Sequence, residues 1–448
     1  MRYFASVPVL FLLAHASVIS RQTLANEMAV LSIEDHKIPM VDVCLVVKAG
    51  SSYDPENKDG LAFLTARLLT YGTKTRSALE IAGQIEHLGS ALNTGCTEDV
   101  ITLRTKALSR NLEKVIEVMA DCAINSQFAD TEVGRIKGEM LSQIQRENDD
   151  PFAMVAKTYR SLLFGRHPYA HSPIGFDSTV KNIQRGDVVK YYQLTFAPEN
   201  AFLVVVGDVD KTRLAELVGK YFGKWPRTAV AAGEPFLRDP AAATEPITGP
   251  RGKIVKKDIS QSYILLGHYG VAGANPDWLA VRVMNYAFGG SSLTSRIGLL
   301  IREKKGLAYI TYSYFERKRF AGLFACEVQT KNETGPEAVK LLVEEMKKMQ
   351  TSGALPQELD DAKDYYTGNF PLRYDSYGEK VDMIITEVEL YGGGLSYIDR
   401  FVDRIKAVGL DAVNQAARDY LYPDNYVLVV VGNISAADIN LPEIAWEE

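Results

Sequence analysis

The stretch LTFAPENAFLVVVGDVD, residues 194–210, decides the fold, because a second version of it, YLYPDNYVLVVVGNIS, occupies residues 420–435. Gly207 in the first version matches Gly432 in the second, 225 positions further along the chain (432 − 207). Each version begins with a proline-containing extended segment, continues as a run of apolar residues typical of a buried strand, and ends at a glycine turn. The chain therefore carries the same strand twice.

Two further segments repeat in the same order. The apolar helix expected at 61–72 resembles residues 279–290, displaced by 218 (279 − 61), and the charged helix expected at 130–143 resembles residues 356–369, displaced by 226 (356 − 130). Three matching segments in one order indicate a duplicated unit. In each half, apolar strands alternate with amphipathic helices. We predict an α+β fold of two homologous domains, each a mostly antiparallel sheet packed with helices.

The domain boundaries follow from this duplication and from the composition between the two copies. The segment before residue 251 is rich in Ala and Pro and has little periodicity, which is typical of a linker. We predict, in chain order, a signal peptide and lead-in at 1–26, an N-terminal domain at 27–226, a linker at 227–251, a C-terminal domain at 252–441 and a tail at 442–448.

Composition and charge argue against several classes of protein. The net charge is −6 with both signs interspersed, so a general nucleic-acid binder is not expected. The two densest basic runs, at 302–306 and 316–319, are interpreted as solvated edges. The four cysteines form no CxxC pair, and we interpret them as structural thiols.

The N-terminus has the pattern of a signal peptide. Arg2 precedes the apolar run VPVLFLLA, and a small-residue cleavage box follows at Ala14-His15-Ala16. This pattern predicts a periplasmic or secreted protein. Because no acidic residue occurs before Glu27, a mitochondrial transit peptide remains the alternative. We predict no transmembrane segment in the mature protein, since no other run is long and apolar enough to be a candidate.

Residue types alone leave the chemistry open. His167 and His171 are four residues apart, but the surrounding prolines place them in a loop, so a metal role is not favoured. Arg302 lies near the end of a predicted helix and Tyr309 at the start of the next strand. Together they can offer a charged fork and a phenol donor to a carbonyl or oxyanion. The alternative is an arginine favoured by the helix dipole and a tyrosine packed on the sheet.

Several longer motifs carry a family resemblance that spans roughly residues 28–436. They are VKAGSSYDPENKDGLA, LTYGT, LLFGRHPYAHSPIG, FAPENAFLVVVGDVD, YFGKWP, SSLTSRIGLLIREKKGLAY and YPDNYVLVVVGN. With these motifs the chain resembles the pitrilysin/insulinase family of zinc metallopeptidases, the inverzincins. It is most similar in organisation to short two-domain subunits like those of mitochondrial processing peptidase and its bacterial relatives.

The resemblance implies that the zinc site of the family is lost here. An active member carries H-x-x-E-H directly after the GLA that opens the helix at residue 61, and a third glutamate ligand follows on a later helix. In this chain, Phe63 and Arg67 stand where the family has the two histidines, and Ala66 stands where it has the general base. Gln143 takes the place of the third ligand, and Ile136 takes the place of the glutamate that supports it. Phenylalanine and alanine cannot bind zinc, a guanidinium repels the ion, and a neutral glutamine is a poor ligand. We therefore expect no metal and no cofactor on this chain, and zinc on a partner subunit.

The resemblance also implies what is retained. In the family, an arginine and a tyrosine from a C-terminal domain complete the active site, and in two-chain members they come from the subunit that lacks zinc. Arg302 and Tyr309 match these two positions, and the loop Gly289, Gly290, Ser291 and Ser292 is interpreted as flexible or substrate-facing. We expect a chain that is not a peptidase alone but forms a heterodimer with a homologous zinc-bearing peptidase and contributes to the hydrolysis of peptides or unfolded polypeptides. The alternatives are a non-enzymatic scaffold and a peptide-binding protein of the same fold.

Overall fold

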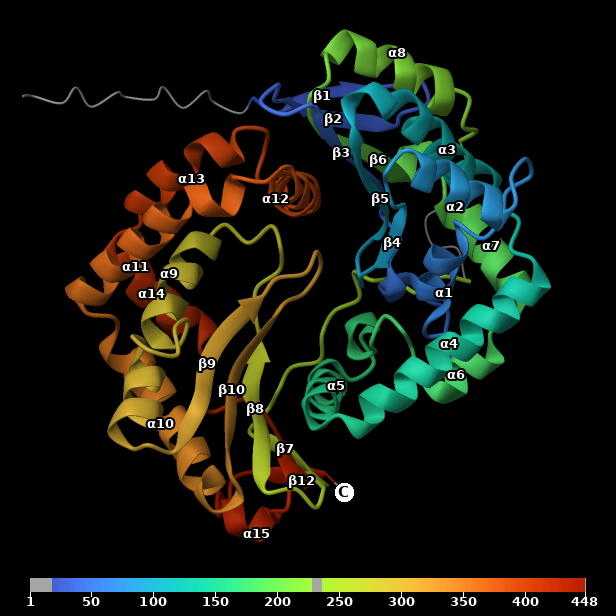
Figure 1. Cartoon of the computed structure of the whole chain (residues 1–448). Helices are drawn as coiled ribbons and strands as arrows, with labels where there is room; N and C mark the ends of the chain where they lie inside the picture. Colours follow the sequence, from blue (N-terminus) through green and yellow to red (C-terminus); the bar gives the residue numbers. More distant parts are fainter. Residues whose placement is uncertain (1–17, 228–235, 448) are drawn as a thin grey trace, which may run out of the picture.

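The protein has two halves, each built around a six-stranded sheet, as seen in a computed structural model that describes residues 18–227 and 236–447 (Figure 1). In the N-terminal half the strands are β1 (Ser20–Thr23), β2 (Ala29–Glu34), β3 (Met40–Val47), β4 (Asn93–Cys96), β5 (Ile101–Leu108) and β6 (Ala201–Gly207). They are ordered β1-β2-β6-β3-β5-β4, and only β2 and β6 run parallel.

The C-terminal sheet repeats this arrangement. Its strands are β7 (Arg251–Lys256), β8 (Gln261–Tyr269), β9 (Ala308–Glu316), β10 (Leu323–Lys331), β11 (Val427–Gly432) and β12 (Ala445–Glu447). They are ordered β12-β7-β11-β8-β10-β9, with parallel pairing only among β12, β7 and β11. Strands β6 and β11 take equivalent inner positions and are buried along their whole length, which is why both read as uninterrupted apolar runs. The predicted α+β fold of two mostly antiparallel sheets is confirmed.

Helices surround both sheets. Those of the N-terminal half are α1 (Leu61–Leu68), α2 (Ala78–His87), α3 (Leu112–Asn125), α4 (Asp130–Asp149), α5 (Pro151–Phe164), α6 (Asp177–Asn182), α7 (Arg185–Thr195) and α8 (Lys211–Phe222). Those of the C-terminal half are α9 (Trp278–Phe288), α10 (Gly335–Ser352), α11 (Pro356–Asn369), α12 (Tyr377–Met383), α13 (Tyr397–Lys406), α14 (Leu410–Tyr420) and α15 (Ala436–Ile439), with π-helical segments at Gly298–Lys304 and Ile384–Leu390. In the described part of the chain no helix is long and apolar enough to cross a membrane.

The ends of the chain add strands to the sheets. The predicted lead-in contributes β1, which pairs antiparallel with β2, and the predicted tail at 442–448 contributes β12, which pairs parallel with β7. The ordered C-terminal sheet therefore extends to Glu447. Most of the predicted signal peptide, residues 1–17, and part of the predicted linker, residues 228–235, lie outside the described residues.

The two halves exchange helices. Helix α5 packs on β8 and β11 of the other half, where Val155 and Leu163 join a buried cluster with Leu265 and Val429. In the opposite direction, α12 packs on β3 and β6, as Figure 1 shows. The exchange is reciprocal because α5 and α12 follow the equivalent helices α4 and α11. The predicted boundary after residue 226 therefore separates the chain into repeats but does not separate the hydrophobic cores.

Buried charged contacts surround the β9–β10 hairpin, and the one made by Lys318 joins the two halves. Lys318 is buried and its Nζ lies 2.9 Å from the carboxylate of Glu98, while Arg317 forms an ion pair with Glu387. The interpretation of residues 316–319 as a solvated edge is thus wrong for these two side chains. Their burial is tolerated because each cation meets a carboxylate that another part of the chain supplies.

Candidate functional site

The start of α1 is held by a buried carboxylate. Asp54 accepts hydrogen bonds from the backbone N–H groups of Gly60, at 2.8 Å, and Ala62, at 2.7 Å. Gly60 has φ of 100°, and a Cβ there would lie 2.6 Å from the carbonyl oxygen of Ile174, so only glycine fits. The motif before α1 therefore sets where the helix begins, independently of any metal.

The apolar replacements on α1 and α4 belong to the core of the N-terminal half. Ala66 is 1% exposed and Ile136 is 0% exposed, and both lie in one buried cluster. Phe63 is half-buried and packs against the same cluster. These three positions, which the resemblance assigns to the family zinc site, thus contribute to packing.

The polar replacements pair with neighbouring side chains. The guanidinium of Arg67 lies 2.8 Å from the Glu139 carboxylate, which joins α1 to α4, and Glu139 also pairs with Arg135. Gln143 donates a hydrogen bond to Glu147 at 3.0 Å, one turn along α4. A cation at the family zinc position would meet the charge of Arg67. Across the described ranges, no group of three or more His, Cys, Asp or Glu side chains is arranged to hold a metal ion. The residues present do not fit zinc.

Glu139 and Glu147 are the members of this ion network that the sequence did not single out. Glu139 lies four residues before Gln143 on α4, so it faces the same side of the helix, and this spacing is the only signal that points to it.

The loop histidines are buried. His171 is 4% exposed, and its Nε2 lies 3.5 Å from a carboxylate oxygen of Asp59. Burial lowers the pKa of His167 and of His171, which favours the neutral rings. The turn Pro168–Ala170 separates the two histidines, in agreement with the predicted loop. We assign both a structural role.

Arg302 and Tyr309 lie together on the C-terminal half. The Arg302 guanidinium carbon is 4.9 Å from the centre of the Tyr309 ring, which is cation–π geometry. Arg302 is supplied by the π-helical segment Gly298–Lys304, and Tyr309 by the second residue of β9. Tyr309 remains 78% exposed, so the ring is not packed on the sheet as the alternative interpretation required.

The glycine- and serine-rich loop before this segment is ordered by hydrogen bonds. Its first residue, Gly289, accepts a hydrogen bond from the Ser313 backbone N–H at 2.7 Å, which ties the loop to β9. The Ser291 hydroxyl accepts from the backbone N–H groups of Leu293 and Thr294, at 3.3 and 3.2 Å. Gly290 is exposed, and Ser291 and Ser292 are half-buried. The loop interpreted as flexible or substrate-facing forms a hydrogen-bonded turn, and its role toward a substrate stays a prediction.

Asn285 and Ser313 support this turn and were not expected from the sequence. The Ser313 hydroxyl donates to the Asn285 side-chain oxygen at 2.7 Å, and the Asn285 amide donates to the Ser313 carbonyl at 3.0 Å. Both side chains are buried. They join the end of α9 to the middle of β9, and so hold the turn and the strand that carries Tyr309 in one rigid unit.

Comparisons with known proteins agree with this structure. Residues 29–173 match the family described as insulinase (peptidase family M16), and residues 182–366 match the peptidase M16 inactive domain. The uncharacterized zinc protease YmxG of Bacillus subtilis is 24% identical over 92% of this chain and 98% of its own length. The non-peptidase homolog YmxG of Helicobacter pylori is 23% identical over 94% of this chain and 96% of its own length.

Solved structures show the same architecture. A crystal structure of a peptidase M16 inactive domain from Pseudomonas fluorescens has a TM-score of 0.84 and 26% identity, covering 93% of this chain and 99% of that one. A protease from Helicobacter pylori has a TM-score of 0.86 at 21% identity, covering 93% and 100%, which shows the fold alone. The two family matches, which together cover most of the chain, and the duplicated fold show that the chain belongs to the insulinase family, peptidase family M16.

Proposed function

We propose that this chain is the non-catalytic subunit of a heterodimeric M16 metalloendopeptidase. A homologous partner subunit carries the zinc, the reacting water and the general base. The two subunits enclose the substrate in a chamber, and this chain contributes half of the wall of that chamber. It also contributes Arg302 and Tyr309 as groups that bind the substrate carbonyl. The substrates are peptides or unfolded polypeptides. The signal-peptide pattern at the N-terminus supports a periplasmic or secreted complex.

The observation that carries this proposal is the pairing of Arg302 with an exposed Tyr309. A large aromatic side chain that is 78% exposed contributes little to the core. The Arg302 guanidinium over its ring restricts where the ring lies. An accessible phenol beside a cation is suited to stabilise negative charge on a carbonyl oxygen presented by another molecule.

The former zinc site supports the division of labour. Three of its positions are packed into the core, and Arg67 has its charge matched by Glu139. Two similar proteins are described as an inactive domain and as a non-peptidase homolog. These descriptions are consistent with a chain that does not hydrolyse peptides by itself. A subunit of this kind acts through the groups it presents to its partner.

The test is reconstitution with a zinc-bearing M16 homologue. Tyr309→Phe and Arg302→Ala are each expected to lower kcat/KM of the mixed complex by about 10²-fold, the effect of losing one oxyanion donor. The control variants are Tyr422→Phe and Arg418→Ala, which change the same residue types elsewhere in the C-terminal half and should keep wild-type turnover. Size-exclusion mass establishes that each variant still forms the heterodimer.

The outcomes separate the proposal from its alternatives. Near-wild-type turnover in both Tyr309→Phe and Arg302→Ala would reject the carbonyl-binding role. A heterodimer without any gain in peptide hydrolysis would favour the scaffold. Peptide binding by this chain with no heterodimer at all would favour the peptide-binding protein.

A further inference from the structure

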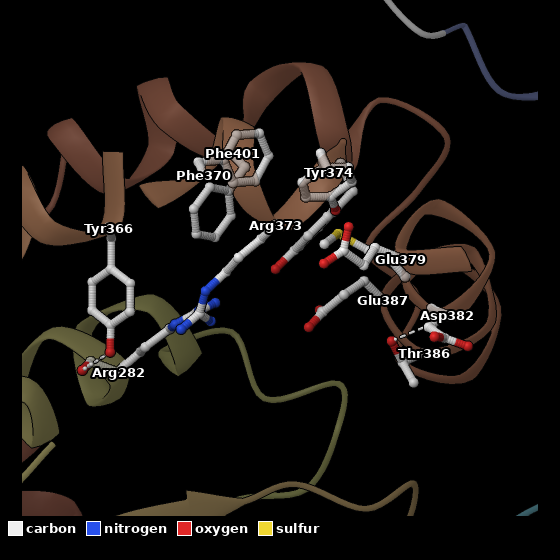
Figure 2. Close-up of a pocket in the computed structure, with 12 residues that line it drawn as sticks. Arg282, Tyr366, Phe370, Arg373, Tyr374, Glu379, Asp382, Thr386, Glu387 and Phe401 are labelled. Carbon is white, nitrogen blue, oxygen red and sulfur yellow. Dashed lines mark hydrogen bonds between the residues drawn. The ribbon is translucent and has the colours of Figure 1, made fainter. Parts of the chain in front are cut away.

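A pocket lies among the helices of the C-terminal half. It has a volume of about 430 Å³ and is formed by α9, α11, α12, α13, the turn Pro371–Tyr374 and the segment Ile384–Leu390 (Figure 2). Neither Arg302 nor Tyr309 lines it. The pocket is therefore distinct from the pair proposed to meet the substrate carbonyl.

Two arginines enter this pocket without a carboxylate partner. Arg282 from α9 and Arg373 from the turn point toward one another in Figure 2, and within the described residues neither forms an ion pair. The Arg282 guanidinium lies over the Tyr366 ring at 4.4 Å, and the polar contact of Arg373 is a 3.4 Å hydrogen bond to the Tyr365 hydroxyl. Two like charges that converge in this way are stabilised by an anion between them.

The acidic side chains of the same pocket already have partners. Glu387 pairs with Arg317, and Asp382 lies 2.6 Å from Arg104. Glu379 accepts hydrogen bonds from the backbone N–H and the hydroxyl of Ser376, at 3.1 and 2.8 Å. Glu379 meets only neutral donors, so the pocket combines two arginines without an ion pair and one carboxylate that no described cation pairs with.

A buried hydroxyl in the pocket also lacks a partner. Tyr374 is 8% exposed, and its Oη has no hydrogen-bond partner among the described residues. A buried donor left without an acceptor is costly, and native structures rarely retain one without a reason. An anionic ligand would supply the acceptor.

We propose that this pocket binds the C-terminal carboxylate of a short peptide. Arg282 and Arg373 form the charged fork, and the Tyr374 hydroxyl donates to the same carboxylate. The stacked rings of Phe370 and Phe401, 4.4 Å apart, provide an apolar wall for the terminal side chain. The carboxylates of Glu379 and Glu387 accept the peptide N–H groups. Their charge also disfavours a doubly charged phosphate, which selects a peptide over other oxyanions.

The proposal is tested by calorimetric titration of the full chain, which requires no partner subunit. The probes are Ala-Ala-Phe with a free carboxylate, its C-terminal amide and inorganic phosphate. The free acid is expected to bind, and the amide and phosphate at least 10-fold more weakly. Arg282→Gln and Arg373→Gln should each weaken binding of the acid at least 10-fold. Arg418→Gln, which removes an exposed arginine from α14, should leave it unchanged.

Tyr374→Phe separates binding from folding. Removal of an unpartnered hydroxyl should keep or raise Tm, yet it should weaken binding of Ala-Ala-Phe several-fold. Equal affinity for the acid and the amide, or tight binding of phosphate, would overturn the assignment. So would a complete lack of binding at millimolar peptide, or unchanged affinity in both arginine variants while they remain folded.

Discussion

The buried ion pair between Lys318 and Glu98 allows the cohesion of the two halves to be measured. Lys318 Nζ lies 2.9 Å from Glu98, and both side chains are 9% exposed. Arg160 lies 2.7 Å from the other oxygen of the same carboxylate. Lys318→Met removes the charge and keeps most of the apolar stem. Breaking a buried pair costs about 3–5 kcal/mol. Because Arg160 remains, we expect the lower end, about 3 kcal/mol of unfolding free energy.

A matched exposed pair provides the control. Lys181 Nζ lies 2.6 Å from Asp177 in α6, but these side chains are 60% and 56% exposed. Lys181→Met should therefore cost no more than about 0.5 kcal/mol, because solvent screens the pair. Urea unfolding at pH 7 compares both variants with the wild type, with Glu98→Gln and the double variant completing a double-mutant cycle. A loss below about 1 kcal/mol for Lys318→Met, or equal losses in the two lysine variants, would refute the reasoning.

The pair of Lys318 and Glu98 also affects how the free energy of unfolding depends on pH. Burial raises the pKa of Glu98, but Lys318 and Arg160 outweigh it and hold the pKa below its usual value of 4.5. The contribution of Glu98 is therefore fully present above pH 4.5 and lost as the pH falls through the lower, folded-state pKa. In Lys318→Met the folded-state pKa of Glu98 rises toward or above the unfolded value, so the stability that is lost on acidification should be smaller than in the wild type.

Three further predictions concern other parts of the molecule. Burial lowers the pKa of His268 to about 4, and its Nε2 accepts the Tyr422 N–H at 3.1 Å, so the folded state holds the neutral ring. The stability that the neutral ring contributes should be fully present above the unfolded pKa of about 6.5 and should fall by about 3 kcal/mol toward pH 4. In urea unfolding, the difference in unfolding free energy between the wild type and His268→Gln should therefore shrink over that range. The purified chain should contain no stoichiometric zinc; a metal-to-protein ratio near one by atomic absorption would contradict this. Gly289→Ala should lower the free energy of unfolding by about 1–3 kcal/mol, because its Cβ would lie 2.2 Å from the Ser313 hydroxyl. Gly83→Ala in α2 places its new Cβ where no atom lies within 4 Å, so it should raise the free energy of unfolding by about 0.5–1 kcal/mol. A more stable Gly289→Ala than Gly83→Ala in thermal or urea unfolding would contradict the packing argument.

Local patterns predicted a large part of the structure. The apolar runs at β6 and β11 and their common offset predicted two related sheets, because a strand buried on both faces has no polar alternation. The proximity of Arg302 and Tyr309 also follows from local spacing, since a helix end and the next strand start lie close together. Their role toward a substrate stays a prediction.

The sequence by itself determined that this chain has a duplicated α+β fold, and its resemblance to the family implied that the zinc-site positions carry side chains that do not suit the metal. Only the tertiary structure decided that α5 covers the opposite sheet, that Lys318 is buried against Glu98, and that Arg282 and Arg373 point toward one another in a pocket also lined by Tyr374, whose hydroxyl has no partner among the described residues. The physical reason is that an amphipathic helix specifies which of its faces is buried but not which sheet covers it. A charged side chain likewise reveals its environment only when groups distant in the sequence supply its partner.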